Sequence, residues 1–217
     1  MANLVVHTVA MEQPLVPNAP SPVGAWATAA GLGALAVIAT WLANRVIVGS
    51  FADAPRPEDL LFEALPYVRG ARWLTVVALV GGLGAFLWVT LRSSPSRIPA
   101  VGARIAVMYL IRAVLIVLTP LAPAHGDGIF VFPQPQFGMF PSGHTALVAM
   151  LALLAPADRP WLRRFEWAMV GLMIAGLLLA RGHYSIDIAG GLLLAYFVAT
   201  VRTRGGSSRR GASPTLG

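Results

Sequence analysis

The chain has 217 residues, of which 57% are hydrophobic and only 12% are charged. About a quarter of the residues in a soluble domain are charged, so this composition excludes an ordinary soluble protein and predicts one polytopic membrane bundle. Cysteine is absent, which excludes disulfides, thiolate catalysis and cysteine metal sites. The net charge of +7 is better explained by membrane topology and anionic lipid headgroups than by nucleic acid.

The sequence divides into three parts. Residues 1–22 lack lysine and arginine and are interrupted by prolines, unlike a secretory signal, so we expect a short lead-in. Residues 23–201 form one all-α membrane domain, and residues 202–217 form a tail rich in Gly, Ser and Arg that we expect to be disordered. Within the membrane domain we predict a six-helix bundle, with spans at residues 23–48, 73–91, 102–122, 143–156, 167–182 and 186–201.

The fourth segment is too short to cross the bilayer as a simple helix. From Thr145 to Ala157 it offers 13 residues, which is about 20 Å of helix against about 30 Å of hydrocarbon. Either the helix extends into the following loop, or His144 at its start lies below the headgroup plane.

Arginines between the segments set the predicted orientation. They lie after the second and fourth segments and in the tail, whereas residues 123–141 contain none, so the positive-inside rule places both termini in the cytoplasm. The first loop conflicts with this rule, because Arg56, Arg69 and Arg72 lie on the predicted outside, beside four acidic residues. All 16 basic residues are arginine, and together with the short loops this favours a bacterial inner-membrane protein.

Two motifs place ionisable side chains at the ends of apolar segments. They are Phe140-Pro-Ser-Gly-His144-Thr145 and Arg181-Gly-His183-Tyr-Ser-Ile-Asp187. Such groups are costly at membrane depth and are functional candidates by default. His144 opens the fourth segment and His183 closes the fifth, so the topology predicts that both histidines meet at the extracytoplasmic face.

These residue types suggest phosphoryl chemistry on a lipid. Asp187 follows His183 by four residues, and a carboxylate bonded to one ring nitrogen leaves the other as a nucleophile. His144 then serves as general acid and later as general base. Transferred phosphoryl oxygens need positive or N–H partners; for these we predict Arg112, Arg181, Ser142, Gly143 and Tyr184.

Structural interpretations of the same residues also stay open. Ser142 can simply cap a helix, Arg181 can be an interfacial anchor, and His183 with Asp187 can be an ordinary i,i+4 pair. His125 is expected to be solvated, and the Phe- and Pro-rich stretch 130–140 is either a lid or, as we favour, an interfacial anchor.

At these motifs the chain resembles the sphingomyelin synthase-like branch of the lipid phosphate phosphatase/phosphotransferase superfamily. The resemblance covers residues 55–201 and extends to Tyr109-Leu-Ile-Arg112 and, more weakly, to Pro57-Glu-Asp59-Leu60. Two features depart from the phosphatase branch: its lysine-containing motif is missing, and Leu177 stands where that branch has an arginine.

The resemblance implies a membrane enzyme with a His144, His183 and Asp187 triad that uses no metal and no cofactor. Its partners would be a phospholipid donor and a lipid hydroxyl acceptor, with diacylglycerol released. Two alternatives remain at this point. With water as acceptor the protein is a lipid phosphate phosphatase or phospholipase C-like hydrolase, and without catalysis it is a lipid-binding or transport protein.

Overall fold

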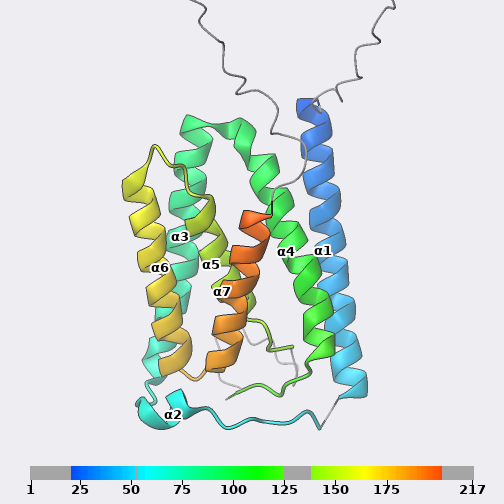
Figure 1. Cartoon of the computed structure of the whole chain (residues 1–217), viewed down its shortest axis with the longest axis vertical. Helices are drawn as coiled ribbons and strands as arrows, with labels where there is room; N and C mark the ends of the chain where they lie inside the picture. Colours follow the sequence, from blue (N-terminus) through cyan, green and yellow to red (C-terminus); the bar gives the residue numbers. More distant parts are fainter. Residues whose placement is uncertain (1–20, 52, 125–137, 202–217) are drawn as a thin grey trace, which may run out of the picture.

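The computed structural model describes residues 21–51, 53–124 and 138–201. In these ranges the chain is helical and contains no strand. Short 3-10 turns at Arg69–Ala71 and Pro95–Arg97 lead into two of the helices. The α-helices are α1 (Pro22–Ser50), α2 (Leu60–Ala64), α3 (Arg72–Ser93), α4 (Ile98–Leu118), α5 (Gly143–Leu154), α6 (Pro160–Leu179) and α7 (Ser185–Thr200) (Figure 1).

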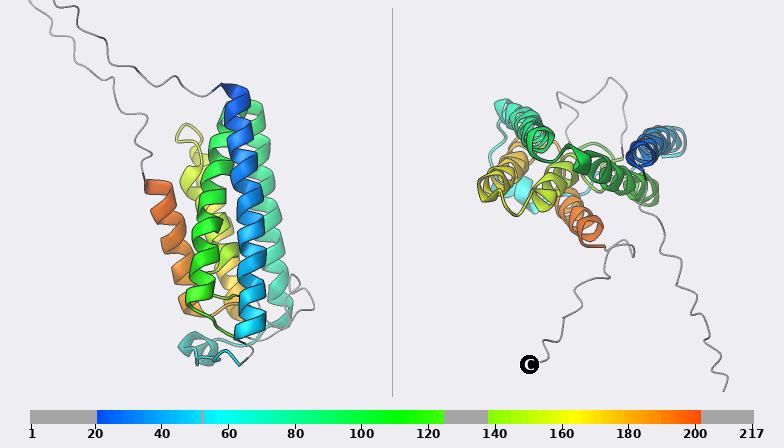
Figure 2. Two further views of the ribbon diagram at one scale, coloured as in Figure 1. Left: turned by 90° about the vertical axis from the view of Figure 1, so that its right-hand side faces the viewer. Right: turned by 90° about the horizontal axis from the view of Figure 1, so that it is seen from above.

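The long helices run up and down side by side, and α2 lies across one end of the bundle (Figure 1). The connections from α1 to α3 and from α6 to α7, with the described ends of the α4–α5 connection, gather at that end, which we call the loop end. Seen along the helix axes, α1 lies at one edge beside α4 (Figure 2). Helix α5 is central and packs against α3, α4, α6 and α7.

Three of the described helical stretches are long and apolar enough to cross a membrane: Pro22–Ser50, Arg69–Ser93 and Pro95–Leu118. Large apolar side chains such as Val37, Val80 and Leu193 are exposed on the outside of the bundle. An exposed apolar surface of this extent suits lipid rather than water. The protein is therefore a membrane protein with transmembrane helices.

Several helix boundaries differ from those predicted. Helix α4 begins at Ile98 rather than residue 102, and α6 begins at Pro160 rather than residue 167. Both helices have a proline in the first turn, where its fixed φ favours a helix start, and the polar residues that follow are part of α6 rather than of a loop. Helix α2 was not predicted, because five residues are too few to give a periodic signal.

Helix α5 is as short as the sequence indicates. It has 12 residues and ends at Leu154, so it does not continue into the following loop. Its length is about 18 Å. Of the two options that the sequence left open, extension of this helix is wrong.

The end of α6 corrects the prediction that His183 closes a helix. The Gly182 N–H donates to the Leu177 carbonyl at 2.8 Å and the Arg181 N–H to the Leu178 carbonyl at 3.1 Å, which is a Schellman arrangement. Arg181 takes the left-handed conformation, with φ 51°. His183 therefore lies in the turn between α6 and α7, four residues beyond the last residue of α6.

Close approach of α5 and α7 depends on glycine. A Cβ at Gly191 would lie 2.6 Å from the Ser142 carbonyl oxygen and 3.2 Å from the Ala146 nitrogen. Both are backbone atoms, so the clash cannot be relieved by a side-chain movement. The start of α5 therefore lies directly on the first turns of α7.

One carboxyl group is fully buried between α3 and α6. Glu166 has no exposed surface, and within the described ranges neither of its carboxyl oxygens has a hydrogen-bond partner. The helices accommodate it because Gly82 has no side chain; a Cβ there would lie 3.0 Å from Glu166 Oε2.

We expect Gly191→Ala to destabilise the bundle by about 1–3 kcal/mol, because overpacking against backbone cannot relax. The matched control is Gly84→Ala in α3, where a Cβ meets nothing within 4 Å and helix propensity improves. Thermal unfolding in detergent compares the two variants. Equal melting temperatures would contradict the close α5–α7 packing.

Left-handed backbone at Arg181 predicts a difference between two substitutions that both remove the guanidinium group. Arg181→Gly should be more stable than Arg181→Ala by about 1 kcal/mol, because only glycine adopts positive φ without cost. Chemical or thermal unfolding of both variants gives this difference directly. A more stable alanine variant would show that residue 181 does not adopt the left-handed conformation.

Candidate active site

The two histidines of the predicted motifs lie together at the loop end. His144 is in the first turn of α5, and His183 is in the α6–α7 turn. Their ring centroids are 6.0 Å apart, with an angle of 64° between the ring planes. His183 is buried, whereas His144 is partly exposed. Two imidazoles from distant parts of the chain thus share one site.

Asp187 binds His183 as the spacing predicts. The distance between His183 Nδ1 and Asp187 Oδ2 is 3.2 Å, and Asp187 has no exposed surface. The same oxygen accepts the Tyr184 N–H at 3.2 Å, and Asp187 lies in the first turn of α7, where a negative charge is favoured. With this carboxylate as acceptor, Nδ1 carries the proton and Nε2 keeps its lone pair.

Ser142 fixes the start of α5 and joins it to α7. Its side-chain oxygen accepts from the Thr145 N–H at 3.3 Å and from the Thr145 hydroxyl at 3.1 Å. Its own N–H donates to the Asp187 carbonyl oxygen at 2.9 Å. Ser142 is fully buried. Its hydroxyl caps α5, which is the structural interpretation of this residue that the sequence left open.

Arg112 reaches the loop that precedes α5. Its Nε donates to the Pro141 carbonyl at 2.8 Å and one terminal nitrogen donates to the Gly138 carbonyl at 3.0 Å. Nearby, the Tyr109 hydroxyl donates to the Gly143 carbonyl at 3.2 Å. Side chains of α4 therefore hold the first histidine motif by binding its backbone carbonyl groups. The sequence did not reveal this role.

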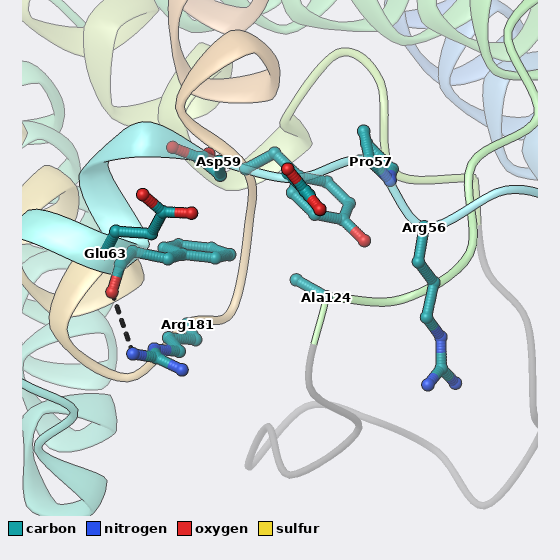
Figure 3. A pocket seen from close by; sticks show the side chains of 9 residues that line it. Arg56, Pro57, Asp59, Glu63, Ala124 and Arg181 are labelled. Atoms are coloured by element: carbon teal, nitrogen blue, oxygen red, sulfur yellow. Dashed lines mark hydrogen bonds between the residues drawn. The ribbon is translucent and has the colours of Figure 1, made fainter.

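Arg181 and Tyr184 connect the α6–α7 turn to α2 and to the segment that follows α4. A terminal nitrogen of Arg181 donates to the Phe62 carbonyl at 2.8 Å (Figure 3). The Tyr184 hydroxyl donates to the Ala122 carbonyl at 3.2 Å. Burial raises the pKa of the Tyr184 hydroxyl above its ordinary value, so it remains a neutral donor.

Asp59 belongs to the same end of the molecule and was missed as a site residue. One carboxyl oxygen accepts the Leu61 N–H at 2.9 Å and caps α2, and the other accepts the N–H of Ser185, the first residue of α7. Asp59 is buried. An aspartate before an apolar run is a helix-cap signal, but its partner 126 positions away could not be read from the sequence.

A pocket of about 330 Å³ opens beside these residues. The first loop contributes charged and aromatic side chains, and Arg181 and Tyr184 come from the turn that carries His183. Figure 3 shows Glu63 and Arg181 on one side of this pocket and Arg56 on the other. In the described ranges, no three His, Cys, Asp or Glu side chains form a cluster that could hold a metal ion.

Comparison with known proteins does not assign the chain to a family: no family model matches it, and no curated protein is significantly similar to it.

Four features named from the sequence lie outside the described residues: the lead-in before residue 21, His125, most of the stretch 130–140, and the tail from residue 202. Functional inference therefore depends on the geometry around His144 and His183.

We expect Arg112→Lys to lower stability by about 1–2 kcal/mol, because one ammonium group cannot reproduce two bonds from a planar fork. Arg104→Lys on the same helix is the control, since the Arg104 side chain makes no hydrogen bond or ion pair within the described part of the chain. Thermal melting of both variants is the measurement. A stable Arg112→Lys protein would show that the carbonyl contacts do not hold the α5 loop.

Proposed function

We propose that the protein is a membrane phospholipid headgroup phosphotransferase, similar in chemistry to sphingomyelin or ceramide phosphoethanolamine synthases. One observation carries the proposal: two imidazoles with centroids 6.0 Å apart, one of them bonded to a buried aspartate. In this proposal α1, α3, α4, α5, α6 and α7 all span a bacterial inner membrane, with both termini in the cytoplasm. The loop end then faces the extracytoplasmic side.

In the first step Nε2 of His183 attacks the phosphorus of the donor phospholipid. A nitrogen–phosphorus bond forms and the bond from phosphorus to the diacylglycerol oxygen breaks. His144 supplies the proton that this leaving oxygen takes up. Asp187 stabilises the imidazole because its carboxylate oxygen accepts a hydrogen bond from the Nδ1–H group, with 3.2 Å between the two heavy atoms.

In the second step the acceptor hydroxyl attacks the phosphohistidine. His144, now without its proton, takes the hydroxyl proton, the nitrogen–phosphorus bond breaks, and free His183 is restored. A lipid hydroxyl as acceptor gives headgroup transfer. Water as acceptor gives hydrolysis instead; Arg56, Glu58 and Glu63 around the neighbouring pocket are exposed, so water reaches this end of the bundle.

The start of α5 and the α6–α7 turn offer donors for phosphoryl oxygens. The first N–H groups of a helix have no partner within the helix and favour anions, which supports Gly143 and His144 backbone contacts. Within the described ranges, Arg181 Nε is buried and has no hydrogen-bond partner. Arg112 lies beside Gly143 and adds positive charge to the site.

We expect His183→Ala and Asp187→Asn to lower headgroup transfer by about 10²-fold or more, while the protein still folds. Purified protein in detergent is incubated with a phospholipid labelled on its phosphate, with and without ceramide or diacylglycerol. Asp158→Asn is the control, because its side chain is exposed and it lies in the α5–α6 connection at the opposite end of the bundle.

Each outcome of this assay has a distinct meaning. Label in the lipid acceptor, lost in His183→Ala, supports the phosphotransferase. Label in a water-soluble product makes the protein a hydrolase. No label transfer in any variant leaves a non-catalytic lipid-binding protein, and full activity of Asp187→Asn contradicts the orienting role of this carboxylate.

A further inference from the structure

Exposed arginines gather at the end of the bundle opposite the loop end, which we call the arginine end. They come from the end of α3, the α3–α4 connection, the α5–α6 connection and the first turns of α6 (Figure 1): Arg92, Arg97, Arg159, Arg163 and Arg164. Among the described residues, Asp158 is the one exposed acidic residue at this end. Its 3.8 Å contact with Arg159 is a solvent-exposed ion pair, which contributes little. The protein itself therefore leaves most of this positive charge unbalanced.

The arginine end lies at the level of a membrane surface. Arg92 and Arg97 flank the turn between α3 and α4, which belong to stretches long and apolar enough to cross a membrane. A turn between two spanning helices must lie where the headgroups begin. Val89, one turn before Arg92, packs in one cluster with Leu162 at the start of α6. The start of α6 therefore lies beside the end of α3, at the same level.

Three of these arginines have N–H groups available for a ligand. Arg92, Arg163 and Arg164 make no hydrogen bond or ion pair within the described part of the chain. The Arg92 guanidinium carbon lies over the Trp88 ring, 3.8 Å from its centroid. This contact uses the flat face of the guanidinium, whereas the N–H groups that bind phosphate lie along its edge. Stacking thus orients Arg92 without occupying its donors.

Two further features of the arginine end indicate a lipid. The first turn of α6 contains no acidic residue, although negative charge is favoured at a helix N-terminus, so an external anion gains there. Trp88 and Trp161 are exposed by 59% and 54%, and tryptophan is enriched at the level of the headgroups. An indole ring beside a guanidinium fits a phosphate that carries acyl chains better than a phosphate free in water.

We propose that the arginine end binds an anionic phospholipid of the surrounding leaflet. Its phosphate is bound between Arg92 and the arginines at the start of α6, and its acyl chains lie along exposed apolar side chains such as Leu91. This lipid is a bound ligand and not a substrate, because the histidines lie at the other end of the bundle. The inference does not depend on the proposed phosphotransferase activity.

Native mass spectrometry of the delipidated protein in detergent tests the site. The protein is mixed with equal amounts of dioleoyl phosphatidylglycerol and dioleoyl phosphatidylcholine, and the bound copies of each are counted. We expect a preference for the anionic lipid of about tenfold or more, since each arginine near a membrane surface contributes about fivefold. Arg92→Gln/Arg163→Gln/Arg164→Gln should lose this preference. All variants share the histidine site, so a lipid held there contributes equally to each.

The matched control is Arg69→Gln, because Arg69 is also exposed but lies at the loop end, where four acidic residues accompany it. This variant should keep the preference. An equal loss in Arg69→Gln and in the triple variant would show attraction to overall charge and overturn the site. Equal retention of both lipids by the unmodified protein, or an unchanged preference in the triple variant, would also overturn it.

Excess inorganic phosphate distinguishes a lipid from a free anion. We expect it not to displace phosphatidylglycerol, and displacement would overturn the lipid assignment in favour of a soluble phosphate. The substituted arginines are exposed, so the triple variant should fold. If it does not, Arg92→Gln and Arg163→Gln replace it as single variants, and each should lower the preference by about fivefold.

Discussion

The site depends on the position of Asp187, which joins three segments through one residue. Its carboxylate binds His183 and the Tyr184 N–H, so the α6–α7 turn is held to the first turn of α7. Its backbone carbonyl accepts the Ser142 N–H, so the start of α5 is held to the same turn. Gly191 permits this contact because it presents no side chain to Ser142. The separation of the two histidines is therefore set by the contacts of Asp187 with the α6–α7 turn and with the start of α5. Arg112 and Asp59 add contacts from α4 and from the first loop to the same segments.

The length of the apolar runs in the sequence predicted most of the helices. In lipid, a long apolar run can satisfy its backbone N–H and C=O groups within its own segment only by forming a helix. The boundaries were less predictable. The beginning of α6 contains Arg163 and Arg164, which look like loop residues in a sequence but lie on a helix that starts at Pro160. The end of α6 could not be predicted, since a left-handed residue after a helix is usually glycine and here it is Arg181. The crossing of the membrane by the two shorter helices, α5 and α7, belongs to the proposed function.

The candidate site was predictable where its residues are close in sequence. Asp187 follows His183 by four positions, and that spacing predicted their contact. The roles of Arg112 and Asp59 were not predictable, because both residues bind backbone groups of distant segments. Almost every residue has a backbone carbonyl and N–H group, so the residue type of the partner does not indicate such a contact. Arg112 was predicted only as a phosphate contact and Asp59 was not predicted as a site residue, so their contacts with distant loops came from the structure alone.

Under the proposed topology, in which α7 spans the bilayer, the short length of this helix has a consequence for the surrounding lipid. Its 16 residues form a helix of about 24 Å, whereas an average hydrocarbon core is about 30 Å thick. Large apolar side chains such as Leu193 and Phe197 are exposed along the helix. Hydrophobic mismatch of this kind thins the bilayer locally. Thinning along α7 lowers neighbouring headgroups toward the level of His144 and His183. Bilayer thickness is then a physical variable that sets how far a lipid phosphate lies from these histidines, and thicker membranes hold it farther away.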